Sequence, residues 1–196
     1  MVARAFAKDV KPGHRYRSFF TPSNAMAPTI EANVDAVLVD ASAYDAAQPQ
    51  RGDIIAFAPP LPSKNLFLKR VLAVPGDRLV VRAGRIEVNG RSLPASYPAM
   101  HPDYDFAIAS YRLLRDRDSL DPTLSDIPPR PRWTAPDRLP TGCYFVIGDD
   151  VNNSEDSHVF GCAELRGNFS SGPRRGQPTS LAGKVVDIVK GRRSGS

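Results

Sequence analysis

Short apolar runs separated by turn residues make up most of this 196-residue chain, and no long stretch has the 3.6-residue period of an amphipathic helix. Residues 34–40 (VDAVLVD) alternate as a strand does. Residues 51–60 (RGDIIAFAPP) begin with a turn, become apolar and stop at two prolines. Residues 65–74 (NLFLKRVLAV) form an apolar run that ends at a Pro-Gly turn. The pattern predicts strands joined by turns.

Further segments continue this pattern toward the C-terminus. Residues 77–82 and 85–88 are predicted to form a hairpin around Ala83-Gly84. Residues 142–148 (GCYFVIG) and 183–190 (GKVVDIVK) each predict another strand. Because no helical segments separate the strands, the predicted fold class is mainly β, with predominantly antiparallel strands.

Proline content divides the chain into parts. Residues 94–140 hold nine of the 19 prolines and many charges, which indicates an irregular insertion with short strands. The length fits one domain that carries such an insertion. The predicted β domain consists of residues 18–93 and 142–190. Residues 94–141 form the predicted insertion or cap, and residues 1–17 and 191–196 are predicted to be flexible ends.

Charge and composition narrow the possible partners. The net charge of +5 comes from 26 basic and 21 acidic residues that are dispersed along the chain, which favours solubility over nucleic-acid binding, with attraction to anionic lipid head groups as a second interpretation. No metal-ligand spacing is present, and no cofactor is expected. Cys143 and Cys162 fit either a disulfide in an oxidising compartment or two buried thiols. The sequence contains no apolar run of about 18 residues, so no transmembrane segment is predicted, and the N-terminus lacks a signal-peptide core.

Lys69 is unusual because it lies within an apolar run. One interpretation is a lysine on an edge strand whose side chain extends into solvent. The other is a buried amine, whose pKa falls toward neutrality so that it becomes a usable general base. The neighbouring Arg70 is expected on the opposite face of the strand. The pattern alone leaves both interpretations of Lys69 open.

The densest polar stretch is residues 148–161, GDDVNNSEDSHVFG. It is either a solvated turn rich in Asx residues or a loop that presents functional groups to a cleft, since it directly follows a buried strand. Ser154 is placed to hydrogen-bond an amine. The carboxylates are expected to pair with nearby cations: Asp149 and Asp156 with Arg70 or His158.

A second loop, residues 21–30 (TPSNAMAPTI), is clamped by two prolines. Such stiffness is expected where a loop must hold a group in fixed geometry. Yet the centre of this loop is Ala25, whose methyl group carries no chemistry.

Four motifs occur in a recognisable order: P-S-x-x-M-x-P-T, R-G-D-I-I-A-F, L-K-R-V-L-A-V-P-G-D and G-D-x-x-x-N-S-x-D-S. In this order they resemble bacterial signal peptidase I, the serine–lysine endopeptidase that removes secretory signal peptides. The resemblance covers residues 18–90 and 142–190. It implies a mainly β fold of antiparallel sheets or a barrel of the signal-peptidase type, and a site at the extracytoplasmic (periplasmic) face of the bacterial inner membrane. The implied partners are preprotein signal peptides and the membrane surface.

The resemblance also implies roles for individual residues. Ala25 stands at the position of the nucleophilic serine, and Lys69 matches the general base. Ser23 matches the serine whose hydroxyl helps to form the oxyanion hole, and Ser154 matches the serine that orients the lysine. Met26 and Phe67 are expected to bind substrate. The residues that brace the site are Arg70, Asp149, Asp156 and His158, with His158 where arginine is usual.

The predicted function is a signal peptidase I-like serine endopeptidase that cuts after small residues, in Ala-x-Ala contexts. With Ala25 in place of the nucleophile, the chain is predicted to be inactive or to trap its substrate, because alanine cannot be acylated. Two explanations of Ala25 are open. In the first, the alanine is an engineered substitution or a rare variant on an otherwise working scaffold. In the second, the chain is a natural pseudo-peptidase that binds peptides without cutting them. A conjugative-pilus maturation peptidase of the same group is a further alternative. A self-cleaving repressor is disfavoured, since its DNA-binding helices are not predicted.

Three aromatic residues are expected either at the lipid interface or in the core: Phe19, Phe20 and Trp133.

Overall fold

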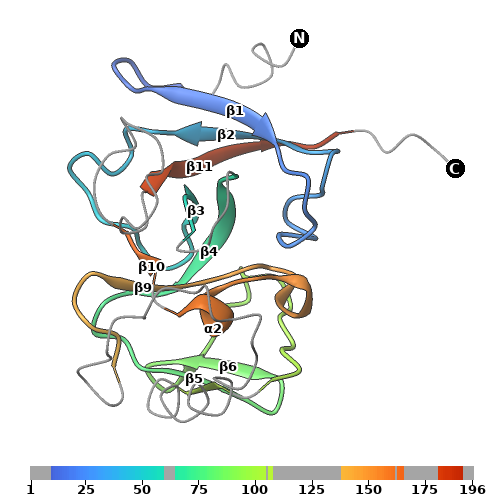
Figure 1. Cartoon of the computed structure of the whole chain (residues 1–196), viewed down its shortest axis with the longest axis vertical. Helices are drawn as coiled ribbons and strands as arrows, with labels where there is room; N and C mark the ends of the chain where they lie inside the picture. Colours follow the sequence, from blue (N-terminus) through green and yellow to red (C-terminus); the bar gives the residue numbers. More distant parts are fainter. Residues whose placement is uncertain are drawn as a thin grey trace, which may run out of the picture.

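Two antiparallel sheets contain all the strands in the described part of the chain. The computed structural model describes residues 10–59, 65–104, 106–107, 138–161, 163–165 and 181–191. The larger sheet has seven strands in the order β1-β2-β11-β3-β4-β9-β10 (Figure 1). Its members are β1 (Tyr16–Phe20), β2 (Ala36–Asp40), β3 (Ile54–Phe57), β4 (Phe67–Ala73), β9 (Cys143–Ile147), β10 (Ala163–Glu164) and β11 (Leu181–Val189). The predicted mainly β fold of antiparallel sheets is confirmed.

The smaller sheet lies at the opposite end of the molecule from β1 and β2 (Figure 1). Its order is β7-β6-β5-β8, formed by β5 (Leu79–Arg82), β6 (Arg85–Val88), β7 (Arg91–Ser92) and β8 (Phe106–Ala107). The predicted hairpin is β5–β6, and both residues of its turn have positive φ, 48° at Ala83 and 72° at Gly84. Two-residue turns of this handedness match the twist of antiparallel strands.

Strand β4 is the structural centre of the molecule, because it contributes to three apolar clusters. Leu72 packs in the cluster that joins the small sheet to β9, and Val71 packs with the aromatic residues around Phe160. Leu68 packs with the residues of β2 and β11. Both faces of β4 are therefore buried, and any polar side chain on this strand lies inside the protein.

Three details differ from the sequence predictions. The edge-strand interpretation of Lys69 is wrong, because β4 is hydrogen-bonded on one side to β3 and on the other to β9. The flexible N-terminal end is shorter than predicted, since Tyr16 and Arg17 already pair with β2. The polar loop after β9 contains two short helical segments, the 3₁₀ turn η4 (Val151–Asn153) and the helix α2 (Ser157–Phe160).

Two sequence predictions concern a membrane-spanning segment and the two cysteines. No helix within the described ranges has the length and apolar character needed to cross a membrane. Cys143 is disulfide-bonded, and the only other cysteine in the sequence, Cys162, lies outside the described residues, as do Trp133 and most of the predicted insertion.

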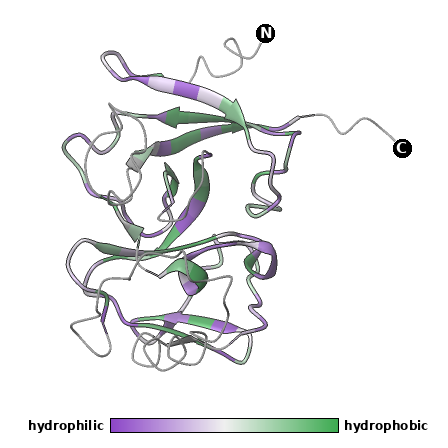
Figure 2. Ribbon diagram, viewed as in Figure 1, coloured by the Kyte–Doolittle hydropathy of each residue, from purple (hydrophilic) through white to green (hydrophobic). Residues whose placement is uncertain are grey.

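β1 changes from hydrophilic to hydrophobic toward its C-terminal end (Figure 2). There Phe20 is 51% exposed, whereas the preceding Phe19 packs against the cluster of β2 and β11.

Candidate active site

Lys69 carries its amine into the interior next to the loop that follows β9. The residue is only 3% exposed, and Nζ donates a hydrogen bond of 2.7 Å to Ser154 Oγ. Nζ also lies 5.4 Å from the centre of the Phe67 ring. Within the described residues, the amine thus has one hydrogen-bond partner and one aromatic neighbour, which limits its hydration.

Burial decides the protonation of this amine. Removal of the ammonium from water lowers the pKa of Lys69 to about 8, against the opposing effect of the nearby carboxylates of Asp156, Glu155 and Asp149. A substantial fraction of the amine is therefore neutral near pH 8. A neutral amine is able to accept a proton, which an ordinary surface lysine at this pH is not.

The loop that carries Ala25 is fixed by its own backbone. The Ala25 N–H donates to Ser23 Oγ at 3.2 Å, and the carbonyl of Ala25 accepts from the N–H of Asp150 at 3.1 Å. Met26 is 2% exposed and packs with Ile30 beneath the loop. The stiffness predicted from the prolines is thus supported by contacts on both sides of residue 25.

Gly148 is the point where the two loops meet. A Cβ atom at this position would lie 2.3 Å from the carbonyl oxygen of Ala25 and 2.3 Å from Ser154 Oγ, closer than real Cβ atoms approach. Residue 25 and the partner of Lys69 therefore share one small space, which only glycine leaves open. Gly148 heads the G-D-x-x-x-N-S-x-D-S motif, but the motif alone does not indicate this close approach.

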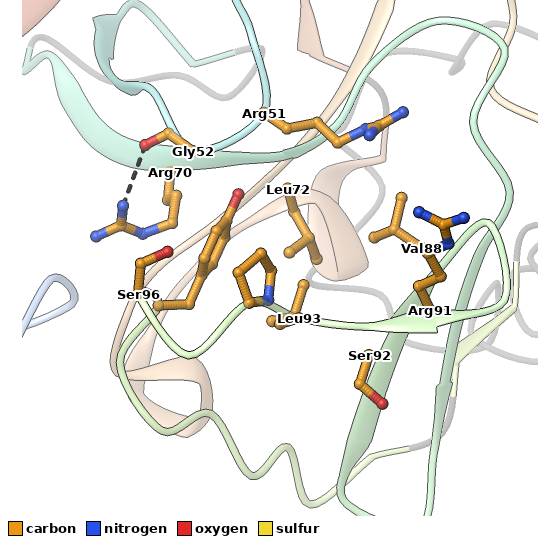
Figure 3. Close-up of a pocket in the computed structure, with 11 residues that line it drawn as sticks. Arg51, Gly52, Arg70, Leu72, Val88, Arg91, Ser92, Leu93 and Ser96 are labelled. Atoms are coloured by element: carbon orange, nitrogen blue, oxygen red, sulfur yellow. Dashed lines mark hydrogen bonds between the residues drawn. The ribbon is translucent and has the colours of Figure 1, made fainter.

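A buried ion pair supports the site from the other face of β4. Arg70 Nε and Nη2 donate to the two oxygens of Asp149 at 2.7 and 2.6 Å, and Nη1 donates to the Gly52 carbonyl at 3.1 Å (Figure 3). Thr29, in the Ala25 loop, donates its hydroxyl to Asp149. The Tyr97 ring lies 5.2 Å from the Arg70 guanidinium. This network ties the start of the polar loop to the Ala25 loop.

Asp156 organises the second half of the polar loop. It is fully buried, accepts from the Gly148 N–H at 3.2 Å, and caps α2 by accepting from the His158 N–H. Its carboxylate also contacts His158 Nδ1, and the imidazole stacks on Tyr104 with ring centres 4.1 Å apart. This ion pair is charged only when the imidazole is protonated.

The structure joins Lys69 to Ser154 and Ala25 to Ser23, with Gly148 between the two loops. Both pairings expected for the acids are present, Asp149 with Arg70 and Asp156 with His158. Three residues that contact these ion pairs were not predicted from the sequence: Thr29, Tyr97 and Tyr104. Thr29 stands in the P-S-x-x-M-x-P-T motif, which could have indicated it. Tyr97 and Tyr104 come from the segment predicted to be irregular, where no pattern marks them. Among the described residues, no group of His, Cys, Asp and Glu is arranged to hold a metal ion.

A buried lysine amine with a pKa of about 8, beside a clamped loop in a β fold, is the arrangement that serine–lysine hydrolases need, although residue 25 here carries no hydroxyl. A family model described as signal peptidase, peptidase S26, matches residues 15–167, and the chain belongs to this family.

The chain is also similar to individual proteins. The signal peptidase I of Leptolyngbya laminosa is 34% identical over 149 residues, which cover 72% of this chain and 59% of the relative. An inactive signal peptidase IA of Staphylococcus aureus (strain MRSA252) is 26% identical over 152 residues, covering 76% of this chain and 74% of that protein. A crystal structure of a signal peptidase I from Enterococcus faecalis V583 shares 26% identity, with a TM-score of 0.42, covering 71% of this chain and 98% of that one. The chain spans less than two thirds of the length of the Leptolyngbya relative.

Proposed function

We propose that this chain has the scaffold of a signal peptidase I-type endopeptidase, which takes an extended signal peptide ending in an Ala-x-Ala segment. The single observation that carries the proposal is the buried Lys69 amine, with a pKa of about 8, held by Ser154 next to the loop of residue 25. A peptide added as a strand beside the site would bring its scissile carbonyl to residue 25. The Phe67 ring, next to Lys69 Nζ, is a candidate wall of the substrate groove.

The proposed reaction requires a hydroxyl at position 25. In an Ala25→Ser variant, the new Oγ attacks the scissile carbonyl carbon while Lys69 Nζ accepts its proton. The tetrahedral intermediate collapses, the peptide C–N bond breaks, and Lys69 returns the proton to the leaving amine. Water then hydrolyses the ester by the same route, with Lys69 as base. Ser154 keeps the amine in line throughout.

Ser23 and the backbone N–H of residue 25 are the proposed oxyanion donors. They are within hydrogen-bond distance of each other, at 3.2 Å, so their donor groups converge on one side of the loop. An arriving oxyanion would accept from both and replace their mutual bond. The chain as written keeps these groups but lacks the nucleophile, whose removal in a serine protease costs about 10⁶-fold in kcat.

We also propose that the protein works at the membrane surface, on the extracytoplasmic (periplasmic) face. The exposed Phe20 at the hydrophobic end of β1 supports this location, because an aromatic ring at a sheet edge suits the lipid interface (Figure 2). Phe19 contributes to the core instead.

The test is cleavage of a purified preprotein by the Ala25→Ser variant. The expected result is a single cut after the Ala-x-Ala segment, at a rate far above that of the unaltered chain. The matched control is the double variant Ala25→Ser, Lys69→Met, which keeps the hydroxyl but lacks the base and should be inert. An Ala25→Ser protein that folds and yet leaves several good preproteins uncut would overturn the endopeptidase proposal.

A non-catalytic peptide-binding protein is the second candidate, and Ala25 is the observation that favours it. One relative, from Staphylococcus aureus, is itself named an inactive signal peptidase. This candidate predicts that an Ala-x-Ala peptide binds the unaltered chain, and that binding without turnover persists in the Ala25→Ser variant. Cleavage by the Ala25→Ser variant would show that the scaffold is not suited to peptide binding alone.

A further inference from the structure

A cavity of about 600 Å³ lies between β4 and the small sheet, on the side of Arg70 rather than of Lys69 (Figure 3). Three of the residues that line it are arginines, Arg51, Arg70 and Arg91, and none of the described lining residues is acidic. Its other walls are largely apolar and include Leu72, Val88, Leu93 and Pro94. The cavity thus combines a cationic rim with an apolar interior.

The three arginines are not equivalent. Arg70 is neutralised by Asp149, as described above. Arg51 donates from Nε and Nη2 to the two oxygens of Asp77, both at 2.6 Å, so its guanidinium is held in place. Arg91 is exposed and has no hydrogen-bond or ion-pair partner for its side chain in the described part of the chain. Among the described residues, therefore, nothing compensates the positive charge of Arg91.

The arrangement of these side chains gives the cavity a direction. In Figure 3 the guanidinium groups of Arg51 and Arg91 lie at the same end of the cavity, and Arg70 lies at the other end. Leu72, Val88 and Leu93 line the space between the two ends. An occupant that fits has an anionic group at one end and an apolar body.

Phosphate is the anion that this end suits best. Arg91 offers five N–H donors that no side chain in the described part of the chain takes up, and Arg51 adds the donors that Asp77 does not use. The two oxygens of a carboxylate satisfy fewer donors than the three terminal oxygens of a phosphate monoester. Guanidinium groups bind phosphate through paired, charge-assisted hydrogen bonds.

We propose that this cavity binds an organic phosphate, with the phosphate between Arg51 and Arg91 and the apolar body against Leu72, Val88 and Leu93. The ligand is either a soluble phosphate monoester or the head group and first carbons of phosphatidic acid, which share this chemistry. The site is distinct from the proposed peptidase site and needs no nucleophile.

The experiment is a calorimetric titration of the unaltered chain with phenyl phosphate. Saturable binding is expected, with weaker binding of inorganic phosphate and none of phenol. Arg91→Gln should weaken the affinity for phenyl phosphate at least about tenfold, since it removes a charge-assisted pair. Arg85→Gln is the matched control: it removes an exposed arginine of the small sheet that does not line the cavity, and the affinity should stay within about twofold.

A second arm separates the two sources of the phosphate. Co-sedimentation with phosphatidic acid vesicles that is lost in Arg91→Gln, but not in Arg85→Gln, identifies the lipid, whereas phenyl phosphate binding without vesicle binding identifies a soluble ligand. Absence of saturable binding in both arms overturns the proposal. Equal losses in the two variants overturn it as well, because they indicate non-specific charge attraction. Neither outcome depends on whether Ala25→Ser restores cleavage.

Discussion

Lys69 Nζ donates a 2.7 Å hydrogen bond to Ser154 Oγ, and this bond joins the middle of β4 to the loop after β9. The two residues are 85 positions apart in the chain, so only the assembled sheet brings them together. Because β4 is buried on both faces, the same fold that aligns the amine also removes it from water. Orientation and a lowered pKa are therefore two consequences of one position.

The pH dependence of a restored enzyme should report this amine. In the Ala25→Ser variant, kcat/KM is expected to rise with pH and level off above an apparent pKa of about 8, because burial lowers the pKa of Lys69 and only the neutral amine accepts the proton. Ser154→Ala in the same background should lower kcat, since the amine loses its alignment. A profile that is flat across pH 8 would argue against Lys69 as the base.

The same burial should cost stability. The pKa of Lys69 falls from 10.5 in the unfolded chain to about 8 in the folded protein, so between these values the unfolded chain binds more protons and stability rises with pH. Lys69→Met removes the buried ammonium and is expected to stabilise the protein near neutral pH, by an amount on the order of a few kcal/mol.

Urea unfolding at several pH values measures this effect. The advantage of Lys69→Met over the unaltered chain should be greatest below pH 8 and shrink as the pH approaches 10.5. A variant less stable than the unaltered chain at every pH would mean that the hydrogen bond to Ser154 outweighs the burial of the charge.

The sequence predicts β2 to β6, β9 and β11 because their apolar runs and turns are local features, but it does not predict β1 or the short strands β7 and β10. It leaves Lys69 ambiguous, since an edge strand and a central strand have the same local pattern, and only the pairing of β4 with β3 and β9 decides between them. The order of motifs brought Ser154 and the Ala25 loop into one hypothesis. Contacts such as the stacking of Tyr104 on His158 join a proline-rich segment to a distant loop, and no local pattern encodes them.

Gly148→Ala tests the close approach of the two loops. The added methyl would lie 2.3 Å from both the Ala25 carbonyl oxygen and Ser154 Oγ, so one of the loops must move. The expected loss of stability is about 1–3 kcal/mol, as for overpacking of a core. Ser154→Gly in the same protein should restore only part of it, because the backbone carbonyl remains in the way. Denaturant unfolding measures both, and a neutral Gly148→Ala would mean that the loops are not held together here.

The Arg70–Asp149 pair offers the sharpest comparison between a buried and an exposed ion pair. Asp149→Asn keeps the shape of the side chain but leaves the Arg70 guanidinium buried without its counter-charge, and the expected loss of stability is about 3–5 kcal/mol. The control is Asp45→Asn, which breaks the pair with Arg15, whose side chain is 64% exposed, and should cost less than about 1 kcal/mol. Urea unfolding with unchanged m-values gives both quantities. Similar losses for the two substitutions would show that Arg70 finds water or another acceptor once Asp149 is neutral, and that the pair does not hold the polar loop against β4.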